Sequence, residues 1–207
     1  MLAKGNVEET PELRKTYNIV GTPTVLLLKP GGEEIDRTLG FMKTAEFIAT
    51  MEGFPKGIGT LKAMMAEEPA KSRDPVFMYR LGSRFQAHNR LDEADARFDT
   101  VVALDPENKS GLADSAFSDK AWDLGKRKDY EGAAAQCREI ARRWPNGPMA
   151  ADAVESVGWY ASKAGKKDEA IAAYQEYLAK WPQRGDTTFV RGQIIELQKP
   201  PAPDSGK

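Results

Sequence analysis

Three segments beyond residue 90 repeat one another and end on the same kind of residue. Their closing prolines are Pro106, Pro145 and Pro182, which lie 39 and 37 residues apart. A period of this length predicts stacked supersecondary units, in which each unit buries its apolar face only against its neighbours. We therefore expect a helical repeat array rather than a single closed core.

Aligning the segments on these prolines gives three units that start at Pro75, Asp114 and Ala151. The eighth position is small in every unit: Gly82, Ala121 and Gly158. The twentieth position is alanine in every unit: Ala94, Ala133 and Ala170. The twenty-fourth position holds Phe98, Cys137 and Tyr174. Small residues let paired helices approach closely, while the larger residues fill the space between repeats.

This pattern resembles the tetratricopeptide repeat, and its longer period is similar to repeats of bacterial cell-envelope proteins. The resemblance implies a mainly α fold, an α-α superhelix of helical hairpins over residues 75–108, 114–147 and 151–184. A capping helix is predicted over 185–199, with Asp186 as its N-cap and with Phe189, Ile194 and Ile195 covering the end of the stack. The tail, residues 200–207, is predicted to be disordered.

Tetratricopeptide arrays bind peptides in a concave groove lined by the first helix of each repeat. In the register above, the residues predicted to face this groove are Tyr79, Trp122, Lys126, Trp159 and Lys163. Trp122 and Trp159 occupy the same position in successive repeats, and exposed aromatic anchors are typical binding hot spots. The alternative is that both tryptophans pack on neighbouring helices and only border the groove. Either way, the resemblance implies a protein or peptide partner.

The first fifty residues have a different pattern. A short helix is predicted from Pro11, followed by a strand at 24–29, a turn at 30–32, a second strand at 34–40 and a helix at 43–51. The unbroken apolar run of the first strand predicts burial on both faces. Residues 53–74 are glycine-rich at their start and predict a linker with a short helix at 60–68.

The stretches VGTPTVLLLKPGGEE and GFMKTAEFIATM make residues 6–52 resemble the C-terminal half of a thioredoxin fold, especially in bacterial cytochrome-linked disulfide reductases. The resemblance implies that Pro23 is the cis-proline of that fold and that Thr22 pairs with a bound substrate peptide. The family places a Cys-x-x-Cys pair ahead of this point, and this chain has none. The alternative is that Pro23 serves only the geometry of the strand entry.

Two strands and two helices bury little apolar surface, and an isolated strand edge favours aggregation. We therefore expect a covering element for residues 1–52. It is either the missing thioredoxin half, if the chain is a piece of a longer protein, or a docking partner.

The chain carries little catalytic material. Its one cysteine, Cys137, excludes an internal disulfide and a metal site built on paired thiolates, and its place in the repeat predicts a packing role. The one histidine, His88, is predicted to be a solvated surface residue. No catalytic residue, cofactor or metal site is therefore predicted.

The formal net charge is −1, from 30 basic and 31 acidic residues, which gives no basic excess for nucleic acid. No apolar run reaches membrane-spanning length and no signal peptide is predicted, so the compartment stays open between cytoplasm and cell envelope.

Two functions follow from these patterns. In the first, the repeats are a protein-interaction scaffold attached to a redox-inert segment. In the second, the native protein is a thiol-disulfide oxidoreductase whose Cys-x-x-Cys lies upstream, and the repeats position its substrate.

Overall fold

The computed structural model describes residue 5 and residues 9–199, and these residues are mainly helical. They divide into two compact units, with the boundary inside one helix between Ala116 and Phe117. Each unit is described by itself below, and the predicted tail at 200–207 lies outside the described residues.

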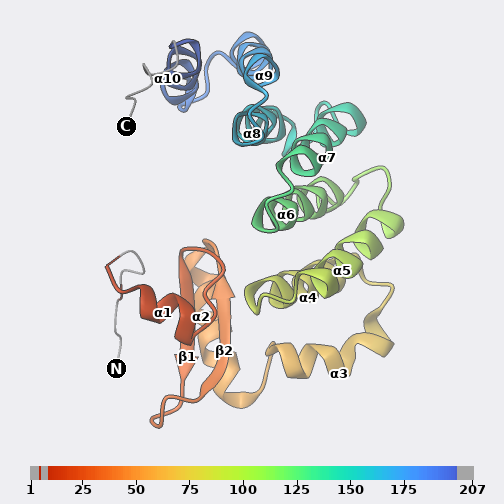
Figure 1. The fold of residues 1–207 in the computed structure, drawn as a ribbon. Helices are drawn as coiled ribbons and strands as arrows, with labels where there is room; N and C mark the ends of the chain where they lie inside the picture. The colour runs from red at the N-terminus through yellow and green to blue at the C-terminus, as the bar shows by residue number, and fades with distance from the viewer. Residues whose placement is uncertain (1–4, 6–8, 200–207) are drawn as a thin grey trace. The chain divides into compact units, whose positions relative to one another are not determined.

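The first unit begins with a helix, a two-stranded sheet and a second helix (Figure 1). Their bounds are α1 Pro11–Thr16, β1 Thr24–Leu28, β2 Glu34–Leu39 and α2 Thr44–Gly53. The strands are antiparallel, and the register pairs Thr24 with Leu39 and Leu27 with Asp36. This order agrees with the predicted helix-strand-strand-helix segment. The resemblance of this segment to half a thioredoxin fold stays a prediction.

The predicted burial of the first strand is wrong. Every residue of β1 is half-buried, whereas the most buried positions of the sheet lie in β2, at Asp36, Arg37 and Thr38. In the described part of the chain β1 has a single neighbouring strand, so it lacks a strand on its second edge that would help to bury a continuous apolar run.

A 3-10 turn and three helices complete the first unit. They are η1 Phe54–Lys56, α3 Leu61–Lys71, α4 Pro75–Ala87 and α5 Leu91–Leu104. The helix predicted at 60–68 extends to Lys71, and the Thr60 hydroxyl caps it by accepting a hydrogen bond from the Ala63 N–H at 3.2 Å. The core of this unit lies between α3, α4 and α5, with Leu81 and Phe98 fully buried.

The second unit is an array of antiparallel helices. They are α6 Ala113–Lys126, α7 Tyr130–Arg143, α8 Ala150–Lys163, α9 Lys167–Lys180 and α10 Thr187–Gln198. The first four residues of α6 belong to the first unit. α8 packs on both α7 and α9, and α9 packs on α10. Glycines allow these close approaches: a Cβ built on Gly158 in α8 would lie 2.5 Å from Cε1 of Tyr174 in α9.

Of the three residues predicted to cover the end of the stack, Ile194 does so, and Phe189 and Ile195 do not. Val190, Ile194 and Leu197 pack against the last core cluster, while Phe189 and Ile195 are 52% and 61% exposed. The spacing of four and three residues places the first set on one side of a helix. Asp186 is the N-cap residue of α10, as predicted, but its side chain makes no capping hydrogen bond and its carboxylate accepts one from the Tyr177 hydroxyl instead.

Candidate functional site

Two tryptophan–lysine pairs recur on the first helices of successive repeats. In α6 the Lys126 ammonium lies 4.9 Å from the ring centroid of Trp122, and in α8 the Lys163 ammonium lies 5.5 Å from that of Trp159. Both pairs have the i,i+4 spacing that places side chains together on a helix surface. A cation over an indole face is attracted to the ring quadrupole, so each lysine helps to fix the orientation of its tryptophan.

Trp159 is the more accessible of the two indoles, with 40% of its surface exposed, whereas Trp122 is half-buried. Two tyrosine rings meet Trp159 edge to face, Tyr160 at 4.8 Å and Tyr130 at 6.5 Å between centroids. These contacts hold a large aromatic surface in one orientation while part of it still faces solvent. A rigid, partly exposed aromatic residue is the kind of group that anchors a partner.

The first helices of these repeats touch at a glycine. A Cβ built on Gly125 of α6 would lie 2.6 Å from Cε1 of Tyr160 in α8, so the missing side chain lets the tyrosine ring approach the α6 backbone. Trp122 and Lys126 flank Gly125 on α6, and Trp159 neighbours Tyr160 on α8. The two tryptophan–lysine pairs therefore belong to two helices that are in direct contact.

Acidic side chains lie at the N-terminal end of α8, opposite the end that carries Lys163. Arg184 donates to the Asp152 carboxylate at 2.6 Å, and its Nε lies 3.9 Å from the Asp186 carboxylate. Burial raises the pKa of Glu155, the neighbouring charges of Asp186 and Asp152 raise it further, and Arg184 only partly offsets this. Carboxylates therefore outnumber cations at this end of α8.

Tyr79, the groove residue predicted in the first repeat, belongs to the first unit. It packs against that unit's core, with its ring 5.8 Å from the ring of Phe98. The positions equivalent to the tryptophan and the lysine hold Ser83 and Ala87 in this repeat. The tryptophan–lysine pair is thus a feature of the second and third repeats.

The predicted substrate-binding pair, Thr22 and Pro23, lies at the entry to β1. The peptide bond between them is cis, the isomer that the thioredoxin resemblance implies. Thr22 is exposed, and the Pro23 carbonyl accepts a hydrogen bond from the Gly40 N–H at 2.9 Å. A substrate-binding role for either residue stays a prediction.

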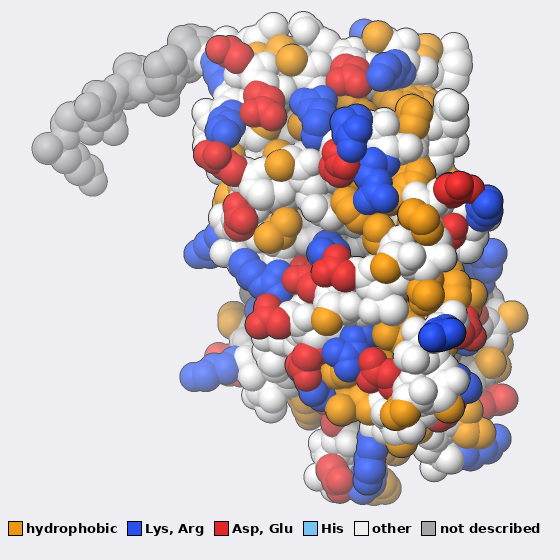
Figure 2. Space-filling view, turned by 90° about the vertical axis from the view of Figure 1, so that its right-hand side faces the viewer, with side chains coloured by type: hydrophobic (Ala, Val, Ile, Leu, Met, Phe, Trp, Pro, Cys, Tyr) orange, Lys and Arg blue, Asp and Glu red, His pale blue; other side chains and the backbone are white. Residues whose placement is uncertain are grey.

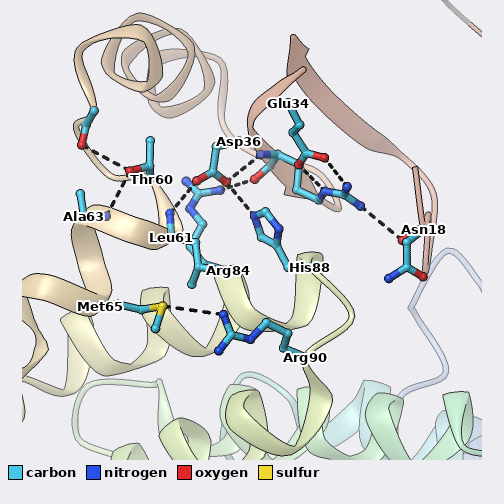
Figure 3. A network of polar contacts seen from close by, with 12 residues as sticks. Asn18, Glu34, Asp36, Thr60, Leu61, Ala63, Met65, Arg84, His88 and Arg90 are labelled. Atoms are coloured by element: carbon cyan, nitrogen blue, oxygen red, sulfur yellow. Dashed lines mark hydrogen bonds and ion pairs between the residues drawn. The ribbon is translucent and has the colours of Figure 1, made fainter. Parts of the chain in front are cut away.

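The sequence patterns missed a buried polar cluster around Asp36 (Figure 3). The Asp36 carboxylate is 2% exposed and accepts hydrogen bonds from the N–H groups of Arg37 and Leu61, at 2.7 and 2.5 Å. His88 lies 3.1 Å from the same carboxylate. The prediction of a solvated His88 is therefore wrong, because the C-terminal end of α4 packs against β2.

Burial raises the pKa of the Asp36 carboxyl, but the hydrogen bonds from His88, Arg37 and Leu61 together outweigh burial and hold this pKa below its usual value. Leu61 is the first residue of α3, where a negative charge is also stabilised by the helix dipole. Nearby, Arg84 donates to the Arg37 carbonyl at 2.9 Å and stacks over Phe54 at 4.8 Å. The cluster joins β2, α3 and α4 and is a structural centre of the first unit.

The one signal that could have revealed this cluster is the presence of an aspartate inside a predicted strand. Aspartate is depleted in strands, so its place between Ile35 and Arg37 is unusual. Its partner His88 stands 52 residues later, where local periodicity gives no indication of the contact.

Cys137 is buried in α7, as its position in the repeat predicts. Burial, together with the charge of Glu155, raises the pKa of its thiol to about 12. The thiol is therefore protonated at neutral pH and acts as a small apolar group. No cluster of potential metal ligands is found among the described residues, and none of the described helices is long and apolar enough to cross a membrane.

Comparison with known proteins identifies the helical repeats. A family model of the tetratricopeptide repeat matches residues 118–185. One similar structure, from Podosopora anserina, is described as the nearly identical TPR-like repeats of a kinesin light chain. Its sequence is 11% identical to this one, and its TM-score is 0.53 over 66% of this chain and 75% of that chain. A comparison with the curated proteins finds no match.

Two structures of MamA are similar as well. One is 15% identical, with a TM-score of 0.50 over 76% of this chain and 94% of that one. The other, the MamA RS-1 ArsTM double mutant, is 18% identical, with a TM-score of 0.50 over 77% of this chain and 97% of that one. At these identities the similarity establishes the fold. Residues 118–185 are therefore tetratricopeptide repeats, and the helical part of the chain has the fold of a tetratricopeptide-repeat array.

Proposed function

We propose that the chain is a protein-interaction scaffold whose second and third tetratricopeptide repeats bind a peptide segment of a partner protein. The observation that carries this proposal is the recurrence of a lysine-covered tryptophan on α6 and α8. Tryptophan is enriched among the residues that dominate interface energetics. The peptide-binding residues of the proposal are Trp122, Lys126, Trp159 and Lys163.

A core role alone does not account for Trp159. Its exposed fraction of 40% is large for a residue whose only task is packing, and its apolar surface faces solvent beside a charged lysine. By contrast, the buried Trp144 packs edge to face on Phe117 at 5.3 Å, which is the arrangement of a core residue. The difference supports a binding role for Trp159.

We expect Trp159→Ala and Trp122→Ala each to weaken peptide binding about 30-fold, the loss of about 2 kcal/mol that defines a hot spot. Peptides selected from a random displayed library on the full chain supply the probe, and fluorescence anisotropy of the labelled peptide gives the dissociation constant.

Phe41→Ala is the matched control, because it removes an exposed aromatic ring from the first unit and should leave the affinity unchanged. Circular dichroism of each variant checks that the helices are retained. Equal affinities for the wild type and both tryptophan variants would rule out this binding surface.

The oxidoreductase hypothesis has no comparable support within the described residues. Thiol-disulfide exchange needs an accessible thiolate, and the one cysteine of this chain is buried with its pKa raised to about 12. Redox chemistry would have to come from a thiol that this chain does not contain.

A further inference from the structure

One face of α8 changes its charge from acidic to basic along its length. Asp152, Glu155, Trp159 and Lys163 follow one another at intervals of three, four and four residues, which places them on a single stripe of the helix. We call these four residues the α8 stripe. It begins with two carboxylates, has the exposed indole at its centre and ends with an ammonium group.

The acidic end of the α8 stripe retains unbalanced negative charge. Asp152, Glu155 and Asp186 face one cation, Arg184, which is itself 41% exposed. One guanidinium carries a single positive charge, so Arg184 neutralises the three carboxylates only in part. The raised pKa of Glu155 has the same origin, since burial and two neighbouring carboxylates disfavour its charged form.

The basic end of the α8 stripe retains unbalanced positive charge. Within residues 9–199, Lys163 has no carboxylate partner, and its ammonium rests on the Trp159 ring. Lys126 occupies the equivalent position on α6, the helix that contacts α8 through Gly125 and Tyr160. Two repeats thus place a lysine beside a tryptophan at this end.

The charges of the α8 stripe are of both signs, with carboxylates at one end and an ammonium group at the other. On the face that Figure 2 presents, Lys and Arg side chains are likewise interspersed with Asp and Glu. A partner would be recognised by charges placed at matching positions over a short distance.

We propose that the partner segment is an extended peptide with an apolar side chain on Trp159, a Lys or Arg toward Asp152 and Glu155, and an Asp or Glu toward Lys163. The inference deepens the proposed function and rests on it. Opposite charges at matching places fix the register of a bound peptide and exclude peptides of uniform charge.

The length of the α8 stripe sets the spacing of the peptide charges. Lys163 lies eight residues beyond Glu155 and eleven beyond Asp152, so the two ends are about 12–16 Å apart at about 1.5 Å per helical residue. An extended chain advances about 3.3 Å per residue. The charges on the peptide should therefore be separated by about four to five positions, whereas a helical partner would need about eight to eleven.

The test begins with selection of random displayed peptides on the full chain, followed by affinity measurements with the selected sequences as labelled peptides. The expected result is an enrichment of one basic and one acidic residue about four to five positions apart, with an apolar residue between them. Lys163→Glu should then weaken such a peptide about tenfold or more. Changing the acidic residue of the peptide to lysine should restore the affinity for this variant.

Two controls separate charge from general damage. Lys180→Glu is the control for Lys163→Glu, because Lys180 also lies near an indole, 5.9 Å from the Trp181 centroid, but on the second helix of the repeat, where it pairs with Glu176. It should leave the affinity unchanged. Asp152→Asn combined with Glu155→Gln should remove the preference for the basic residue and leave the preference for the acidic one.

The outcomes distinguish this inference from the proposed function. Selected peptides that lose affinity in Trp159→Ala but carry charges of one sign, or charges spaced as on a helix, would overturn the inference and leave the scaffold function in place. Peptides whose affinity is the same in Trp159→Ala, Trp122→Ala and the wild type would overturn both.

Discussion

Replacing Asp36 by alanine is expected to destabilise the first unit by about 3 kcal/mol, the cost of breaking a buried polar pair. The substitution leaves the Leu61 N–H and the His88 ring without their shared acceptor, at a position that is 2% exposed in Asp36, although the His88 side chain keeps 23% exposure. It also removes the negative charge that Asp36 of β2 places beside the first turn of α3. The loss is a large share of the total stability of a small domain.

The chain offers a convenient way to measure this loss. All four tryptophans, at positions 122, 144, 159 and 181, belong to the second unit, so their fluorescence reports that unit alone. In urea, Asp36→Ala should shift the transition seen by far-UV circular dichroism and leave the tryptophan transition of the second unit in place. Glu33→Ala, at the exposed turn beside Lys29, should change neither transition. A circular dichroism transition unchanged in Asp36→Ala would contradict the structural role of the cluster.

The same carboxylate should make the first unit sensitive to acid. Because the pKa of Asp36 is lowered on folding, its contribution to stability is complete above the unfolded-state pKa of about 3.9 and is lost as pH falls through the lower folded-state pKa. The difference in urea midpoint between the wild type and Asp36→Asn should therefore be constant from neutral pH to about pH 5 and narrow below about pH 4. A difference that does not change with pH would show that the Asp36 charge contributes nothing.

The second large effect is expected at Gly158. A single Cβ there would already lie 2.5 Å from Cε1 of Tyr174, a ring with no exposed surface, so the longer side chain of Gly158→Leu cannot be accommodated without displacing α9. Overpacking of this kind costs about 3 kcal/mol, which exceeds the gain of about 1 kcal/mol from replacing a helical glycine. Urea denaturation followed by tryptophan fluorescence measures the effect directly in the second unit.

Gly192 provides the matched control for Gly158. It lies within α10 of the same unit, and a Cβ at this position would meet nothing within 4 Å, so Gly192→Leu should be neutral or slightly stabilising.

The second repeat suggests how the clash at Gly158 is relieved, because it pairs Ala121 with the smaller Cys137. Gly158→Ala already places a Cβ 2.5 Å from the Tyr174 ring and should be destabilising, and this cost should disappear in a Tyr174→Cys background. A persistent cost would mean that the tyrosine ring is not its cause.

Periodicity predicted the helical array because each repeat uses the same positions to pack its own two helices together, as Gly82 meets Phe98 and Gly158 meets Tyr174. The burial of Phe98, Cys137 and Tyr174 follows from that register alone. The helices of the repeats are local structures with local signals, including the Asp74 side chain that caps α4 at the Val76 and Phe77 N–H groups.

Features that depend on distant residues were not predictable in this way. The pairing of Asp36 with His88 depends on how β2 meets α4, and the half-buried state of β1 depends on how many strands surround it. Two of the three residues predicted to pack from α10 were also wrong, because Phe189 and Ile195 are as apolar as the residues that pack. Composition shows that a residue can be buried, but which of several apolar residues is buried depends on the surface it meets.

The Asp36 cluster bears on where the protein can be divided. A fragment starting at Pro75, the first residue of the first repeat, would lack Leu61 and Met64 from the core and would expose His88 without its carboxylate. The antiparallel pair β1–β2 is in this sense a non-repeating cap on the first repeat, comparable to the capping units that protect the open ends of solenoids. The shortest autonomous form of the first unit therefore has to begin ahead of β2, so that Asp36 keeps its contacts with Leu61 and His88.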